Sequence, residues 1–221
     1  MWFRKKPATA EHIPFPGLPR TVDGHAALAS VEKLISEHIC LRDVPLFAEL
    51  AEHLHDQTDQ DSRKLLIRGS AALPELAALT TGATLTGLRS TLITDSLTGM
   101  LDEMHSMAGS RLGCIINLTA RALPRQAGSL DGGHDDYHAA AGAGWFQLFA
   151  SNAQEVADFN IIARKVAELS LTPGLCAQDL YRTSHAIQNT LLPEPGLIDK
   201  FLGSPADSIA CPTQAQSVLF G

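Results

Sequence analysis

The stretch from Trp145 to Gln178, WFQLFASNAQEVADFNIIARKVAELSLTPGLCAQ, predicts a strand, a helix and a second strand in succession. The apolar runs Trp145-Phe-Gln-Leu-Phe149 and Leu175-Cys-Ala-Gln178 have the length of buried strands. Between them, Ser151 or Asn152 can cap a long helix that ends near residue 169. Two strands joined through a helix lie parallel in one sheet, because a parallel connection requires a crossover. The stretch therefore predicts a βαβ unit.

The same alternation continues towards the N-terminus of the chain. Strands are predicted at 39–41, 64–68, 90–94 and 113–119. The segment 64–68 has the composition of a buried strand. Helices are predicted at 25–38, 46–55, 71–79 and from 95 to about 108. This pattern indicates an α/β fold with a central, mostly parallel sheet and helices on both faces. A site is expected at the carboxyl ends of the strands, in the loops after Thr94, Thr119, Ala150 and Gln178.

Proline marks both ends of the chain. Pro7, Pro14, Pro16 and Pro19 withhold amide donors, so we expect residues 1–20 to form an extended N-terminal arm. The Pro- and Gly-containing stretch 193–221 is expected to be a C-terminal tail that wraps over the surface. The α/β domain is then predicted at 21–192.

Composition narrows the class of protein. The chain has 221 residues, 45% of them hydrophobic, and a formal net charge of −7, which argues against a nucleic-acid partner. No apolar run has the length of a membrane span or a signal-peptide core. The four cysteines, at 40, 114, 176 and 211, form no Cys-x-x-Cys pair. We therefore expect free thiols in a reducing cytoplasm. A disulfide framework is not expected, and neither is an iron–sulfur cluster bound by this chain alone.

Several spaced motifs resemble the N-terminal domain of the pyruvate:ferredoxin oxidoreductase family, and the similarity covers about residues 20–221. The two strongest are Ser151-Asn-Ala-Gln-Glu-Val-Ala-Asp158, similar to "sNvQEvmDla", and Arg182-Thr-Ser-His185, similar to "RTSHE". Further matches are Thr21-Val-Asp-Gly24, Met104-His-Ser-Met-Ala-Gly109, Ala120-Arg-Ala-Leu123, Gly133-His-Asp-Asp136 and the segment from Pro212 to Phe220. Each motif alone is weak, but their order and spacing together are specific.

The resemblance implies a pyrimidine-type domain of a thiamine enzyme. The implied activity is oxidative decarboxylation of a 2-oxoacid such as pyruvate to an acyl-CoA, with reduction of ferredoxin. Thiamine diphosphate and Mg²⁺ would lie at an interface shared with other chains, because the chain lacks the Gly-Asp-Gly turn and following Asn that usually bind them. The implied partners are thiamine- and iron–sulfur-binding subunits, with ferredoxin or flavodoxin engaged indirectly. On the residues of this chain, we assign no cofactor-binding or metal ligand.

Catalytic positions of the family are altered in this chain. The family's "YPITP" threonine is absent from Cys40-Leu-Arg-Asp-Val-Pro45. The glutamate that should contact the aminopyrimidine ring falls at Leu73. Glu75 lies two residues further along the predicted helix, which turns its side chain by roughly 200°, so it could serve only if the helix were re-registered. The family's "TxSQG" turn is Thr94-Asp-Ser-Leu-Thr98, without the Gln-Gly.

One catalytic-type residue is retained. Arg121 follows the strand predicted at 113–119 and matches the family arginine that binds the 2-oxoacid carboxylate, a role suited to a planar guanidinium. The alternative is a structural arginine that pairs with Asp131, Asp135 or Asp136. The corresponding alternative for the whole chain is a non-catalytic, structural or regulatory relative within a larger redox complex.

Two histidine motifs offer other chemistry. His134 and His138 are four residues apart, which on a helix would place both rings on one face and suit a metal. We favour a solvated or interface loop because Gly132 and Gly133 precede them. A metal hydrolase built on these histidines is the third hypothesis for function. Ser184 and His185 are adjacent in sequence, but catalytic dyads are assembled in space, so we expect His185 to hold a loop or a domain contact.

Overall fold

The computed structural model describes residues 14–56, 65–122, 132–205 and 214. Within these residues, a six-stranded sheet has the order β3-β2-β4-β5-β7-β6, and all its pairings are parallel. Its strands are β2 (His38–Arg42), β3 (Leu66–Ser70), β4 (Ser90–Thr94), β5 (Ile115–Ala120), β6 (Phe146–Ala150) and β7 (Gly174–Asp179). The predicted α/β fold class is confirmed.

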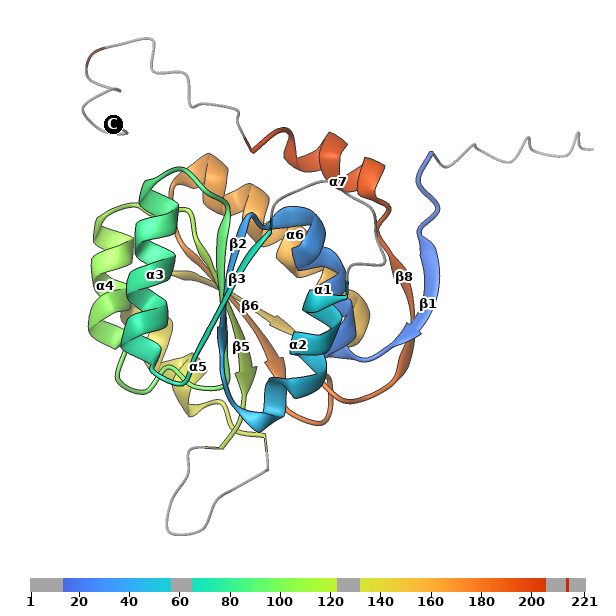
Figure 1. Cartoon of the computed structure of the whole chain (residues 1–221), viewed down its shortest axis with the longest axis horizontal. Coiled ribbons are helices and arrows are strands. Elements are labelled where there is room, and N and C mark those ends of the chain that lie inside the picture. The colour runs from blue at the N-terminus through green and yellow to red at the C-terminus, as the bar shows by residue number, and fades with distance from the viewer. Residues whose placement is uncertain (1–13, 57–64, 123–131, 206–213, 215–221) are drawn as a thin grey trace, which may run out of the picture.

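Helices cover both faces of this sheet (Figure 1). On one face lie α3 (Leu73–Leu85) and α4 (Leu101–Gly109). On the other lie α1 (Gly24–Ile35), α2 (Ala48–His55) and α6 (Ala153–Ser170). Because the helices shield both faces, every residue of the central strands β4 and β5 is buried.

Two helices begin at residues whose side chains cap them, whereas the helix expected from residue 95 begins only at Leu101 and has no side-chain cap. The Asp23 side chain accepts a hydrogen bond from Ala26 N at 2.8 Å and starts α1. Of the two candidates for α6, Asn152 is the cap, since its side chain accepts from Glu155 N at 2.9 Å. The helix ends at Leu171, which has φ 51°.

The edge of the sheet corrects one prediction. The segment 64–68 was expected to be a buried strand, but β3 runs from Leu66 to Ser70 and most of its side chains are exposed or half-buried. It is an edge strand that pairs only with β2 among the described strands, so one flank of it faces solvent. Apolar composition alone does not distinguish an edge strand from a central one.

A second, two-stranded sheet was missed. Strand β1 (Leu18–Val22) pairs antiparallel with β8 (Gln188–Leu192), so the two ends of the domain lie side by side (Figure 1). Helix α7 (Pro195–Leu202) lies in the stretch expected to be a tail. Its Ile198 and Leu202 pack in one buried cluster with residues of α1 and α6. Residues 1–13 of the predicted arm lie outside the described residues.

Short helical segments lie between the main strands and helices. A polar, Gly-rich loop is the structure that the sequence predicts for residues 121–136. Its residues 123–131 lie outside the described part, and a short helix, α5 (Asp135–Ala139), begins just before its end. Single 3-10 turns occur at Pro45–Phe47 and Ala140–Gly142. No helix among the described residues is long and apolar enough to cross a membrane.

A buried polar network fixes the α1 and α6 layer to the sheet. Glu32 of α1 and Arg164 of α6 are each 1% exposed. The hydroxyl of Thr91 connects them, since it donates to Glu32 Oε2 at 2.9 Å and accepts from Arg164 Nη2 at 2.8 Å. Burial lowers the pKa of Arg164, and the Glu32 charge opposes that shift. Buried charges need such partners, so this network is structural.

Candidate functional site

Two arginines and one aspartate meet at the carboxyl edge of the sheet. Arg42 is the last residue of β2, Asp95 follows β4 and Arg121 follows β5. Because β4 lies between β2 and β5, Asp95 lies between the arginines. Its Oδ1 is 2.5 Å from Arg42 Nη1, and its Oδ2 is 2.8 Å from Arg121 Nη2. The Asp95 side chain is 1% exposed, whereas those of Arg42 and Arg121 are 20% and 28% exposed.

The pairing of Arg121 differs from the one expected for a structural arginine. Asp135 and Asp136 were named as partners, but Asp95 is the carboxylate that contacts Arg121. Asp131, also named, lies outside the described residues. Asp136 instead accepts from Ser96 Oγ and Leu97 N, both at 2.8 Å. It therefore fixes the turn after β4, a role that no local sequence signal indicated.

The arginines keep unused donors. Arg42 Nε and Arg121 Nε are buried, and no hydrogen-bond acceptor contacts either atom within the part of the chain that the structure describes. A guanidinium has five N–H donors, and Asp95 engages one nitrogen of each. With one carboxylate and two guanidiniums, the cluster has a formal charge of +1. The positive charge favours an anionic ligand at the accessible parts of the two guanidiniums, while the two Nε atoms are themselves buried.

The altered catalytic positions lie as the sequence suggested. Leu73 is 6% exposed and packs in the core with α4 and the sheet, so an apolar side chain fills the position expected for a glutamate. Glu75 is exposed and accepts from Ser70 Oγ at 2.6 Å. The helix starts with Leu73 inward and Glu75 outward, and the re-registration that Glu75 would need does not occur.

The family motifs at Thr21–Gly24 and Arg182–His185 pack against each other. Gly24 N donates to Thr183 O at 3.0 Å, and His25 N donates to Ser184 O at 3.2 Å. A Cβ at residue 24 would lie 2.2 Å from Gln178 Oε1 and 2.7 Å from Thr183 O, so only glycine fits there. This close approach explains the Asp-Gly of the first motif.

His25 lies at the centre of this contact. Its Nε2 is 3.0 Å from Thr119 Oγ1, and its ring meets those of Phe47 and His185. Burial, followed by the nearby imidazoles of His185 and His53, lowers the pKa of His25 to about 3. His25 is therefore neutral at pH 7. As expected, His185 holds a contact, and its Nδ1 is 2.7 Å from the hydroxyl of Ser184.

The other histidine pair does not form a metal site in this structure. His134 Nε2 lies 3.1 Å from Asp179 Oδ2, and its ring packs on Phe149. His138 instead contacts the ring of Tyr137. No group of three or more His, Cys, Asp or Glu side chains suited to a metal occurs among the described residues. The third hypothesis, a hydrolase, gains no support from this geometry.

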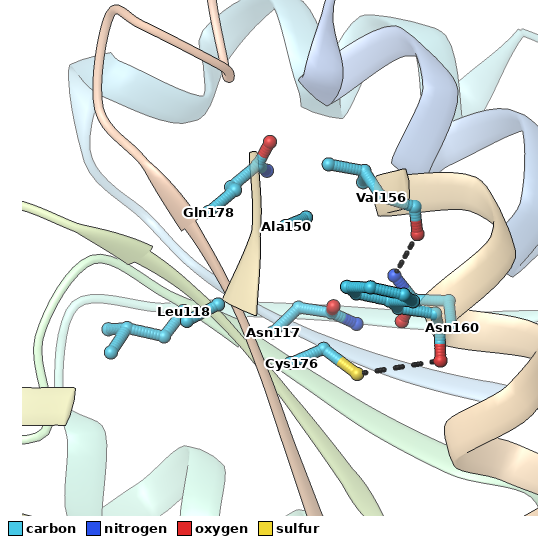
Figure 2. A pocket seen from close by; sticks show the side chains of 9 residues that line it. Asn117, Leu118, Ala150, Val156, Asn160, Cys176 and Gln178 are labelled. Atoms are coloured by element: carbon cyan, nitrogen blue, oxygen red, sulfur yellow. Dashed lines mark hydrogen bonds between the residues drawn. The ribbon is translucent and has the colours of Figure 1, made fainter. Parts of the chain in front are cut away.

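Two hollows lie near the carboxyl edge. A cavity of about 10 Å³ lies between β5, β7 and α6. Figure 2 shows side chains that line it, among them Gln178 and Asn160. It can hold about one water molecule and no organic ligand. A larger cleft of about 400 Å³ lies beside the end of β2, within the size range of ligand pockets. Its lining includes Arg42, Val44, Phe47, His55 and Ile67.

Three of the cysteines are free and buried, namely Cys40, Cys114 and Cys176. Burial raises the pKa of the Cys114 thiol to about 12, so it stays protonated and unreactive. This confirms the expected free thiols at these positions, and Cys211 lies outside the described residues.

Known proteins share both the fold and the sequence pattern. A pyruvate:ferredoxin oxidoreductase of Moorella thermoacetica is 29% identical over 76% of this chain, and a pyruvate-flavodoxin oxidoreductase of Trichormus variabilis is 30% identical over 76%. The chain spans 15% of the length of each. A 2-oxoglutarate:ferredoxin oxidoreductase structure from Magnetococcus marinus superposes with a TM-score of 0.65 and 16% identity, covering 82% of this chain and 32% of that one.

The parallel sheet and its two helical layers have the fold of the pyrimidine-type domains of thiamine diphosphate enzymes. The family described as pyruvate flavodoxin/ferredoxin oxidoreductase, thiamine diphosphate-binding, matches residues 72–215, more than half of the chain. The chain belongs to this family.

The described residues do not fit activation of the thiamine ring. That step requires a carboxylate beside the aminopyrimidine. Leu73 is apolar, and Glu75 faces solvent. Both oxygens of Asp95 are engaged by arginines. If the cofactor contacts this edge, its activating carboxylate must come from elsewhere.

Proposed function

We propose that the chain is a subunit, or a split first domain, of a 2-oxoacid:ferredoxin oxidoreductase complex. The complex would decarboxylate a pyruvate-like 2-oxoacid oxidatively to an acyl-CoA and reduce ferredoxin. This chain would contribute Arg121 to the 2-oxoacid site. The observation that carries the proposal is the position of Arg121: it follows β5 at the carboxyl edge of a domain of this family, and its guanidinium is partly accessible.

The remaining chemistry would come from partner chains. Thiamine diphosphate, Mg²⁺ and the iron–sulfur clusters would be bound mainly by other subunits, which transfer electrons to ferredoxin or flavodoxin. The short span of this chain relative to its relatives supports such partners. Arm 1–20, domain 21–192 and tail 193–221 remain our proposed division, and we place the complex in the cytoplasm.

A second function is favoured by one observation. Leu73 is part of the hydrophobic core, so the position expected for the activating glutamate carries no carboxylate. The chain would then be a non-catalytic structural or regulatory subunit, retained because the fold buries an interface within the redox complex.

Affinity purification of the native protein tests both functions. Partner chains would be identified by mass spectrometry, and thiamine and iron would be quantified. Cluster-bearing partners with stoichiometric thiamine support the first function, in which Arg121→Ala raises the KM for the 2-oxoacid. Cluster-bearing partners without thiamine support the second function. Purification of the chain without any partner would contradict both.

A further inference from the structure

Strand β3 leaves part of its backbone unpaired at the edge of the sheet. The amide of Leu66 and the carbonyl of Ser70 form hydrogen bonds of 2.9 and 2.8 Å with the residues that flank β2. Backbone groups alternate in direction along a strand, so those of Ile67 and Gly69 point away from β2. Among the described strands, only β2 pairs with β3. Two N–H and two C=O groups are therefore directed at the free edge, where a further strand can bond to them.

Ile67 and Gly69 also line the cleft of about 400 Å³ between β2, β3 and α2. Most of the lining is apolar, as at Val44 and Ala51. Gly69 contributes no side chain, and a Cβ added there would meet, among the described atoms, Leu41 O alone at 3.9 Å. Glycine within a strand often marks a close approach of another backbone. The free edge therefore combines unpaired backbone groups with space for apolar side chains.

Arg68 gives the other face of this edge a positive charge. Neighbouring side chains of a strand point to opposite faces, so Arg68 lies on the α3 face, away from the cleft. It is exposed, and the described residues form no salt bridge with it. Glu75 of α3 accepts instead from Ser70 Oγ at 2.6 Å. Glu49 and Glu52 belong to α2 and hence to the opposite side of the sheet (Figure 1). A carboxylate on an added strand would therefore find Arg68 available across the edge.

A second copy of the chain fits this edge poorly. When two β3 strands pair antiparallel through both outward-facing residues, Ile67 lies opposite the partner's Gly69. The two Arg68 side chains are then directly opposite each other, and like charges in that position destabilise the pair. An acidic residue in place of the second arginine reverses the sign of this interaction.

We infer that the free edge of β3 docks an extended segment of another protein chain, which adds a strand to the sheet. Its chemistry is an acidic residue opposite Arg68, flanked by apolar residues that cover the cleft. Main-chain hydrogen bonds to Ile67 and Gly69 supply affinity, and the alternating side chains supply selectivity. This docking does not depend on the 2-oxoacid chemistry proposed for Arg121.

The test is a fluorescence anisotropy titration of the full chain against a labelled peptide of alternating valine and glutamate. We expect saturable binding, with the valines towards the cleft and the glutamates towards Arg68. Replacement of the glutamates by lysines should weaken binding by about tenfold or more, because the lysines would face Arg68. Absence of saturable binding, or equal binding of the two peptides, would overturn the inference.

Methylated peptides separate strand addition from simple adhesion to the cleft. In one peptide the backbone nitrogens of the valines are methylated, and in the other those of the glutamates. Only alternate amides of an added strand face β3, so one of the two peptides should bind more weakly by about tenfold or more and the other should keep its affinity. Loss at the valines indicates an antiparallel strand, and loss at the glutamates a parallel one. Equal effects of the two methylations would contradict a docked strand.

Variants of β3 test the same contact from the protein side. Gly69→Pro removes the outward N–H, and edge strands tolerate proline there, so the variant should stay folded and bind the glutamate peptide about tenfold more weakly. Arg68→Glu should prefer the lysine peptide. Arg20→Glu makes the same change on the exposed strand β1 and should keep the wild-type preference.

An unchanged preference in Arg68→Glu would overturn the inference, and this result is decisive even where Gly69→Pro does not fold. A folded Gly69→Pro with wild-type affinity would overturn it as well. The co-purification experiment judges the proposed function independently, because peptide binding at β3 requires neither thiamine nor iron.

Discussion

The imidazole rings of His25 and His185 meet edge to face, with their centroids 4.9 Å apart. One ring belongs to the first turn of α1, and the other follows β7 near the end of the domain. Backbone hydrogen bonds from Gly24 and His25 to the loop residues Thr183 and Ser184 flank this contact. The family motifs near the start of the domain and after β7 therefore form one structural unit.

The buried His25 should make the protein sensitive to acid. Its folded pKa of about 3 lies below the unfolded value near 6.5, so the unfolded chain binds more protons between these values. Stability is thus retained above about pH 6.5 and falls as the pH drops towards 3. Between pH 7 and 5, His25 should account for a loss of about 2 kcal/mol.

The variant His25→Asn removes this titration. Urea unfolding measures the free energy of unfolding at pH 7 and at pH 5. The difference between these two free energies should be about 2 kcal/mol smaller in the variant than in the wild type. His105→Asn, at an exposed position of α4 on the other face of the sheet, is the matched control and should retain the wild-type difference. An unchanged pH dependence in His25→Asn would show that His25 is not held neutral.

Gly24→Ala should destabilise the fold, because the added methyl would collide with Gln178 Oε1 and with the backbone oxygen of Thr183. Overpacking of this kind costs about 1–3 kcal/mol. Chemical denaturation measures the loss. Gly82→Ala is the control: nothing lies within 4 Å of the added Cβ in α3, and helix propensity predicts a gain of about 0.5–1 kcal/mol. Equal effects of the two variants would contradict the close packing at Gly24.

Leu73→Ala tests whether this position is part of the core. Its side chain packs with Leu76, Met104 and the sheet, so truncation should lower the free energy of unfolding by about 2–4 kcal/mol. Leu79, in the same helix, is 39% exposed, and Leu79→Ala should cost less than about 1 kcal/mol. A mild effect at Leu73 would mean that the position is free to accept a catalytic side chain.

Asp136→Asn should loosen the turn after β4. Oδ2 of the carboxylate accepts hydrogen bonds from Ser96 Oγ and Leu97 N, and Oδ1 accepts from Thr98 Oγ1 at 3.3 Å. The single amide oxygen of asparagine cannot replace both carboxylate oxygens in this buried setting. We expect a loss of about 1–3 kcal/mol in unfolding free energy, with faster amide exchange at Leu97. The neighbouring Asp135 is exposed, so Asp135→Asn should change neither measurement. Unchanged exchange at Leu97 in Asp136→Asn would contradict the role of Asp136.

The sequence by itself determined the order of the strands and helices around the central sheet, the α/β class and the place of Arg121 at the carboxyl edge. These properties follow from hydrophobic periodicity and helix capping, which depend only on residues close together in the sequence. Arg121 was placed at that edge correctly because the end of a strand fixes where the next residue lies. The partner of Arg121 could not be predicted, since any of several nearby aspartates fitted the spacing.

Only the tertiary structure decided which distant groups meet. Asp95 forms salt bridges with both Arg42 and Arg121 because β4 lies between β2 and β5, and no local sequence pattern encodes this strand order. The tertiary structure also paired β1 with β8, placed β3 at the sheet edge and brought His25 against His185. Such contacts depend on through-space packing of segments far apart in the chain. Their energies are set by burial and charge in the assembled fold, not by the residues next to them in sequence.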